Sequence, residues 1–131
     1  MKNLIFIALL LSFSCNKKQE ENRHIDIYYL GKNISYTFNI PCHMIQQPSL
    51  PGVKYVTIND KEFMENFNLH FNTLKEPKEI YPLDARIKII YYHNTQIDTI
   101  CMGEYFSISV NGKPKQDSPQ LLKLIKDKIY N

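Results

Sequence analysis

Apolar and polar residues alternate in the first part of this chain, which predicts β-strands with one buried face. From Ile25 to Tyr29, every second residue is apolar on one side, and the same alternation runs from Ile34 to Ile40. Period-two alternation on both sides of a glycine-containing turn, here residues 31–33, indicates a hairpin. Three prolines and a glycine predict a loop at 41–52, and a further short strand is expected at 53–58.

Two segments carry apolar residues at helical spacing. In the first, we expect Asn59 to cap the helix with Glu62 at its third position, as in a capping box, and Pro77 to end the segment. In the second, Ser118 as the cap and Pro119 at the first helical position begin a C-terminal helix. The residues expected to point inward are Phe63, Phe67, His70, Phe71 and Leu74 in the first helix and Leu121, Leu122, Ile125 and Ile129 in the second.

Between the two helices, the pattern returns to strands at 85–92, 97–102 and 105–110, separated by short polar or glycine-containing turns. Three strands with short links predict an antiparallel meander. The complete order, ββ(β)αβββα, predicts an α+β fold with one antiparallel sheet of about five to six strands and two helices. Such layouts carry many unrelated activities, so the fold by itself predicts no function.

The N-terminus has the pattern of a secretory signal peptide. A lysine at position 2 precedes an apolar run at 4–11, which is followed by Ser12, Phe13, Ser14 and Cys15. The apolar run reaches about ten residues, whereas spanning a bilayer takes about 20. We therefore expect residues 1–14 to be removed rather than to cross the membrane.

The four residues that end this signal resemble the lipobox of bacterial lipoproteins, in the variant form familiar among the Bacteroidetes. Ser14 supplies the small residue before the cysteine, whereas Ser12 stands where an aliphatic residue is usual and Phe13 is bulky. The resemblance implies a lipid on Cys15, a charged tether over 15–23 and anchoring in the bacterial cell envelope. It also implies the outer membrane, with surface display suggested by residues 18–21. Residues 24–131 then form a single domain. The alternative is that Cys15 belongs to a plain cleaved signal or to an uncleaved anchor.

With Cys15 assigned to the lipid, Cys42 and Cys101 remain as an even pair outside the cytoplasm. Such a pair favours a disulfide. The alternative is two separate buried thiols, because free cysteine behaves as a small hydrophobic residue. The sequence leaves both interpretations open.

Catalytic and metal chemistry have little support in the sequence. Cys42 with His43 suggests a thiol nucleophile and its base, and His93 and Asp98 with Cys101 suggest a hydrolase-like trio. Neighbouring residues of an extended chain point to opposite faces, however, and the local sequences typical of catalytic cysteines are missing. The four histidines lack the short spacings of zinc sites. We therefore predict a protein without catalytic, metal or cofactor sites.

The charge balance and the tyrosines indicate the kind of partner. With 16 basic and 13 acidic residues, the formal net charge is +3, which is too mild for a dedicated nucleic-acid binder. Four tyrosines on or beside the strands, Tyr28, Tyr36, Tyr92 and Tyr105, mark either recognition of a protein or glycan or a core on both faces of the sheet. The sequence thus predicts a non-enzymatic envelope lipoprotein that binds a protein or glycan. The alternatives are an envelope inhibitor or immunity protein and, from a different class, a thiol-dependent hydrolase or redox protein. Neither the partner nor the oligomeric state follows from the sequence.

Overall fold

The computed structural model of the chain describes residues 22–46 and 50–131. Its helical elements are the 3₁₀ helix η1 (Cys42–Gln46), α1 (Lys61–Asn72) and α2 (Pro119–Ile129). Its strands are β1 (His24–Leu30), β2 (Val53–Ile58), β3 (Ile87–His93), β4 (Gln96–Met102), β5 (Ile108–Val110) and β6 (Lys113–Lys115).

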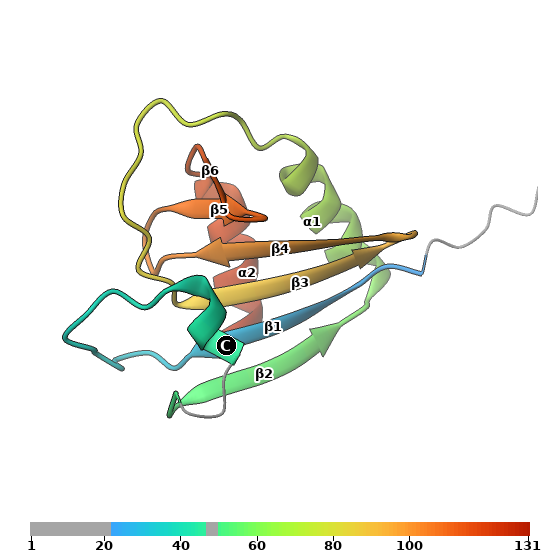
Figure 1. Cartoon of the computed structure of the whole chain (residues 1–131). Coiled ribbons are helices and arrows are strands. Elements are labelled where there is room, and N and C mark those ends of the chain that lie inside the picture. The colour runs from blue at the N-terminus through green and yellow to red at the C-terminus, as the bar shows by residue number, and fades with distance from the viewer. Residues whose placement is uncertain (1–21, 47–49) are drawn as a thin grey trace, which may run out of the picture.

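The six strands form one antiparallel sheet in the order β2-β1-β3-β4-β5-β6. In β1, Ile25 lies opposite Ile58 of β2 on one side and opposite Tyr91 of β3 on the other. In Figure 1, α1 and α2 lie behind the sheet and η1 lies in front of it. The predicted α+β class, with one antiparallel sheet and two helices, is therefore confirmed.

The main core fills the space between the sheet and the two helices. Phe67 of α1 is fully buried, and its ring meets the ring of Tyr91 edge-on at 4.9 Å. The other buried members are Ile25, Ile27, Ile58, Phe63, Met64, Ile87, Ile89, Ile100, Met102, Ile108, Leu121, Ile125 and Ile129. A smaller second cluster contains Leu30, Ile40, Ile45, Leu50 and Ala85. Ile45 belongs to η1, and Leu30 is the last residue of β1. This second cluster therefore holds η1 against the sheet near the end of β1.

The start of α2 was predicted correctly, and the start of α1 was wrong by one residue. Ser118 caps α2 by accepting a hydrogen bond from the Leu121 backbone N–H at 3.2 Å, with Pro119 first in the helix. In α1, Asp60 rather than Asn59 is the cap, and its carboxylate accepts from the Phe63 N–H at 3.0 Å. A carboxylate at this position also complements the positive end of the helix dipole.

The predicted strand at 34–40 is absent, which corrects the expected hairpin. Both edges of β1 are occupied, by β2 and by β3, so this segment has no edge of β1 left to pair with. Its backbone instead bonds the segment before β3. The Ala85 N–H donates to the Ile40 carbonyl at 2.8 Å, and the Arg86 guanidinium donates to the Ile34 carbonyl at 2.9 Å.

The end of the meander also differs from the prediction. The third strand begins at Ile108 instead of 105, because a tight loop at 103–107 closes with the Gly103 N–H donating to the Ser107 carbonyl at 3.0 Å. Beyond β5, Asn111 and Gly112 have φ values of 51° and 79°, the left-handed values that a type I′ hairpin turn requires. This turn adds β6, a short edge strand that tolerates its central Pro114.

Candidate functional site

The two faces of the sheet are covered very differently. Alternation along the strands sends Ile25, Ile27, Ile87, Ile89 and Ile100 toward the helices. The intervening residues point to the other face, on which the described residues place η1 and its flanking loop. We call this second side the open face; its strand residues include His24, Asp26, Tyr28, Tyr55, Thr57, Lys88, Ile90, Tyr92, Ile97, Thr99 and Cys101.

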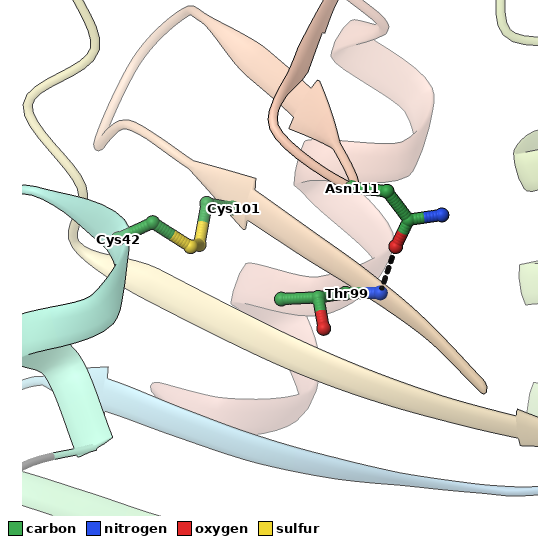
Figure 2. Close-up of a disulfide and its surroundings, with 4 residues drawn as sticks. All are labelled: Cys42, Thr99, Cys101 and Asn111. Carbon is green, nitrogen blue, oxygen red and sulfur yellow. Dashed lines mark hydrogen bonds between the residues drawn. A yellow bond between two sulfur atoms is a disulfide. The ribbon is translucent and has the colours of Figure 1, made fainter.

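A disulfide ties η1 to the open face. Cys42 is the first residue of η1 and Cys101 lies in β4, and their Cα atoms are 5.9 Å apart. Figure 2 shows the bond crossing from η1 to the strand below it. Cys101 is fully buried. The bond thus fixes η1 as a wall that rises from the sheet beside Tyr28 and Lys88, because Lys88 lies directly opposite Cys101 in the register.

Beside this wall lies a continuous polar and aromatic strip. The rings of Tyr28 and Tyr55, on neighbouring strands, have centroids 4.9 Å apart. Thr57 donates to Asp26 Oδ1 at 2.7 Å, and since its single hydroxyl proton is used there, the Tyr55 hydroxyl donates to Thr57 Oγ1 at 2.7 Å. From the wall, the Gln46 amide donates to the Tyr28 hydroxyl at 3.4 Å.

Lys88 is the unusual member of this strip. Three lysines of the described residues are partly buried, and two have partners: Lys115 pairs with Glu76, and Lys126 donates to the Glu104 carbonyl. Lys88 makes no ion pair or hydrogen bond within that same part of the chain. Burial lowers the pKa of Lys88, because a partly desolvated ammonium lacks some of the water that would stabilise its charge.

We call the open corner the group formed by Asp26, Tyr28, Tyr55, Thr57 and Lys88. It combines flat aromatic surface, an acceptor carboxylate and a cation that has no partner in the described part of the chain, on three adjacent strands. Burial raises the pKa of Tyr28, and Tyr55 and Asp26 raise it further, so its hydroxyl stays neutral at physiological pH. The open corner therefore offers a sugar or peptide both ring contacts and charge-assisted hydrogen bonds.

The structure separates the candidate thiol catalysts that the sequence brought to attention. His93 Nε2 and Asp98 Oδ2 are 2.6 Å apart, but both side chains lie on the helix side of the sheet. Cys101 stands three residues from Asp98 and therefore faces the open side, where its sulfur is bonded to Cys42. The expected trio is thus not assembled, and the Cys42–His43 pair has no free thiol.

The histidines and the remaining tyrosines also lie apart. His24 stacks on Tyr92 at 4.4 Å on the open face, whereas the other histidines lie in η1, in α1 and on the helix side of β3. Within residues 22–46 and 50–131, no group of His, Cys, Asp or Glu side chains has the arrangement of a metal site. Tyr36 donates to the Pro51 carbonyl in the loop before β2, and Tyr105 is exposed in the 103–107 loop.

Of the open corner, the sequence singles out only Tyr28. Its neighbours, Asp26 on the same strand, Tyr55 and Thr57 on β2 and Lys88 on β3, belong to no local motif. These residues are identified by the alternation of side chains along each strand. Once β1 is known to pair with both β2 and β3, the polar positions of all three strands fall on one face of the sheet. Strand order, rather than any local motif, therefore defines the open corner.

Cys15, the signal at 1–14 and most of the tether lie outside the described residues. Neither helix of the described part is long and apolar enough to cross a membrane. Comparison of the chain with protein-family models, with curated proteins and with solved structures found no match to any of them.

Proposed function

We propose that this chain is a lipid-anchored, non-enzymatic binding protein of a bacterial cell envelope, and that the open corner is its binding surface. The observation that carries the binding role is the strip beside η1, where aromatic, acidic and cationic groups meet and no helix or strand of the described residues lies over them. The anchoring part of the proposal rests on the resemblance of residues 12–15 to a lipobox and on the charged run that follows. A diacylglyceryl and an N-acyl chain together meet the requirement of more than one acyl chain for stable anchoring.

A binding role is favoured over thiol catalysis because Cys42 and Cys101 are bonded to each other, which leaves no thiolate to act as a nucleophile. His93 and Asp98 resemble part of a catalytic triad, but no cysteine lies on their face of the sheet within the described residues. Asp98 instead bonds Asn111 of the β5–β6 turn at 2.7 Å, which gives the pair a structural role.

The anchor is tested by metabolic labelling with a palmitate analogue. We expect the wild-type protein and the Cys42→Ala variant to take up the label, and the Cys15→Ala variant to lose it. Equal labelling of wild type and Cys15→Ala would contradict lipidation at this residue.

The binding surface is tested in the parent cells by photo-crosslinking. A photoreactive phenylalanine analogue replaces Tyr55 in one strain and Tyr81 in another, because the two side chains are almost equally exposed, at 55% and 53%. We expect a discrete adduct, with protein or with glycan, from position 55 and none from position 81, which lies outside the open face in the 79–86 segment. Adducts from both positions alike, or from neither, would exclude the open corner as the binding surface.

A further inference from the structure

We propose that the open corner binds an acidic glycan, with the carboxylate of one sugar on Lys88 and the ring of that sugar or its neighbour against Tyr28 and Tyr55. This inference rests on the proposed binding role and names the chemical class of the partner. It is carried by three observations on adjacent strands: a cation without a partner among the described residues, an aromatic strip and the acceptor carboxylate of Asp26.

Lys88, which has no partner among the described residues, favours an anionic ligand. Lys88 is partly buried, so folding removes part of the water around its ammonium without supplying a partner among the described residues, and an anionic ligand would find this cation already partly desolvated. Lys88 lies between Tyr28 and the Cys42–Cys101 disulfide in the register, and the described chain supplies it with no carboxylate or carbonyl. A carboxylate of the ligand would satisfy this ammonium through a charge-assisted hydrogen bond.

The aromatic strip calls for a ring-shaped ligand with an apolar face. The Tyr28 and Tyr55 rings, tilted by 39°, form a bent surface that continues across two strands. Tyr55 is 55% exposed although it is one of the largest side chains on β2. Pyranose sugars present a face of C–H groups that packs on aromatic rings, while their hydroxyls remain at the rim for hydrogen bonding.

The acceptors distinguish an acidic glycan from an acidic peptide. Asp26 lies one strand and one row away from Lys88, diagonal to it in the register, and its second carboxylate oxygen accepts no hydrogen bond from the described chain. A run of acidic residues would place a second carboxylate near Asp26, where like charges repel. Each sugar of an acidic glycan instead carries several hydroxyl donors beside its carboxylate, so its hydroxyls can donate to Asp26 while its carboxylate accepts from Lys88.

The wall formed by η1 limits the ligand on one side. Gln46 reaches the Tyr28 hydroxyl from η1, and the disulfide holds the other end of η1 over β4 (Figure 2). On the opposite side the face continues past Ile90 toward Tyr92 and His24 without a covering element among the described residues. The open corner therefore suits an internal stretch or an end of a chain of sugars that lies along the strands.

The test is calorimetric titration of the detergent-solubilised full-length protein with four acidic oligosaccharides: oligogalacturonate, oligoguluronate, hyaluronan fragments and sialyllactose. Each is compared with its carboxyl-reduced, neutral counterpart. We expect at least one acidic form to bind about tenfold or more tightly than its reduced form, as expected for one charge-assisted hydrogen bond. Lys88→Met should weaken that binding by about tenfold or more, and Tyr55→Ala by about tenfold through the lost ring contact.

Two matched variants serve as controls. Lys54→Met removes a lysine of β2 that lies on the helix side of the sheet. Tyr81→Ala removes a tyrosine that is about as exposed as Tyr55 but lies away from the open corner. Both should change the affinity by less than about twofold, a small free-energy change. Thermal unfolding separates binding from folding: because the Lys88 ammonium is partly desolvated and has no partner among the described residues, Lys88→Met should raise the melting temperature while it weakens binding.

Three outcomes would overturn the inference: no binding by any of the four acidic sugars, equal binding of acidic and reduced forms, or equal binding of an oligoglutamate peptide. Equal losses in Lys54→Met and Lys88→Met would also overturn it. Crosslinking from position 55 together with a negative sugar panel would reject the glycan and leave the proposed binding surface standing. Failure of both experiments would reject the binding role itself.

Discussion

Asp98 shows how one residue can link two turns of the sheet and make stability depend on pH. Its carboxylate bonds His93 at 2.6 Å and Asn111 at 2.7 Å, and Asn111 in turn accepts from the Thr99 N–H at 2.9 Å (Figure 2). Burial raises the pKa of Asp98, but the hydrogen bonds from Asn111 and His93 and the attraction of His93 outweigh it, so the pKa is lowered. A lowered pKa in the folded state means that ionised Asp98 stabilises the fold.

The sign of this linkage gives a prediction. The stabilisation from Asp98 should be complete above its unfolded pKa of about 4 and should be lost as the pH falls through the lower folded value. Asp98→Asn should therefore lower the free energy of unfolding by about 1 kcal/mol at pH 7 and change it little near pH 2. Urea titrations at both pH values measure this difference. Asp127→Asn, at an exposed carboxylate of α2, should show no comparable pH-dependent change; parallel curves for Asp98→Asn and wild type would contradict the prediction.

Lys88 illustrates that the neighbours of a residue across a sheet do not follow from the sequence around it. A lysine among apolar residues of a strand is ordinary, because its position predicts only that it faces away from the core. Its significance depends on Tyr28 and Cys101 on the two flanking strands, which are 60 and 13 positions away in the chain. Cross-strand neighbours at such separations follow from topology, and local periodicity contains no information about them.

At the scale of elements, the β5–β6 turn offers a clean test of backbone conformation. Gly112 has a φ of 79°, and a Cβ built there would touch no atom within 4 Å. Gly112→Ala should therefore lower the free energy of unfolding by about 1 kcal/mol through backbone strain alone. Gly31→Ala is the matched control, because Gly31 has no positive φ and its Cβ would meet Ile34 at an ordinary 3.5 Å. Chemical unfolding curves compare them; equal losses in both variants would show that the turn conformation is not the cause.

Elements that depend on residues adjacent in sequence were predicted correctly. Elements that depend on which segments pair with a given strand were not. The α2 start, with Ser118 and Pro119, depends on residues adjacent in sequence, and the structure confirms it. The 34–40 segment has the same alternation as β1, yet β2 occupies the edge of β1 that this segment would need. β6 was not predicted, and its central Pro114 is unusual in a strand, although an edge strand tolerates proline. Alternation predicts that a strand can form but leaves its neighbour undetermined.

At the scale of the whole molecule, the open corner extends along β1 from Asp26 to Tyr28, away from the point where the chain enters the sheet. The chain enters β1 at His24, and Tyr28 lies four residues further, a rise of about 13 Å along the strand. In Figure 1 the two ends of β1 lie on opposite sides of the sheet, with η1 near the far end. The Tyr28–Lys88 row of the open corner therefore lies toward the end of β1 that is farther from the chain's entry into the sheet.

The disulfide connects this arrangement to stability. The bond between Cys42 and Cys101 spans 59 residues, and it joins the wall of the open corner to β4. In the chain-entropy model, closing a loop of this length contributes about 4 kcal/mol, an upper figure because strain and residual unfolded-state structure reduce it. The same bond helps to keep η1 on the sheet, together with the small cluster around Ile40 and Ile45 and the hydrogen bond from Gln46 to Tyr28.

We therefore expect reduction to act on stability and on binding together. Adding reductant should lower the free energy of unfolding of the wild type by about 2–4 kcal/mol, and it should weaken any ligand of the open corner because η1 is released. Cys42→Ala leaves Cys101 as a buried thiol that packs like a small hydrophobic residue, so this variant should match the reduced wild type and ignore reductant. Denaturant unfolding with and without reductant measures the effect, and alkylation of the untreated protein reports the redox state. Two thiols that react freely without reductant, with unchanged stability on reduction, would show that the bond does not form in the cell and that η1 is held on the sheet without it.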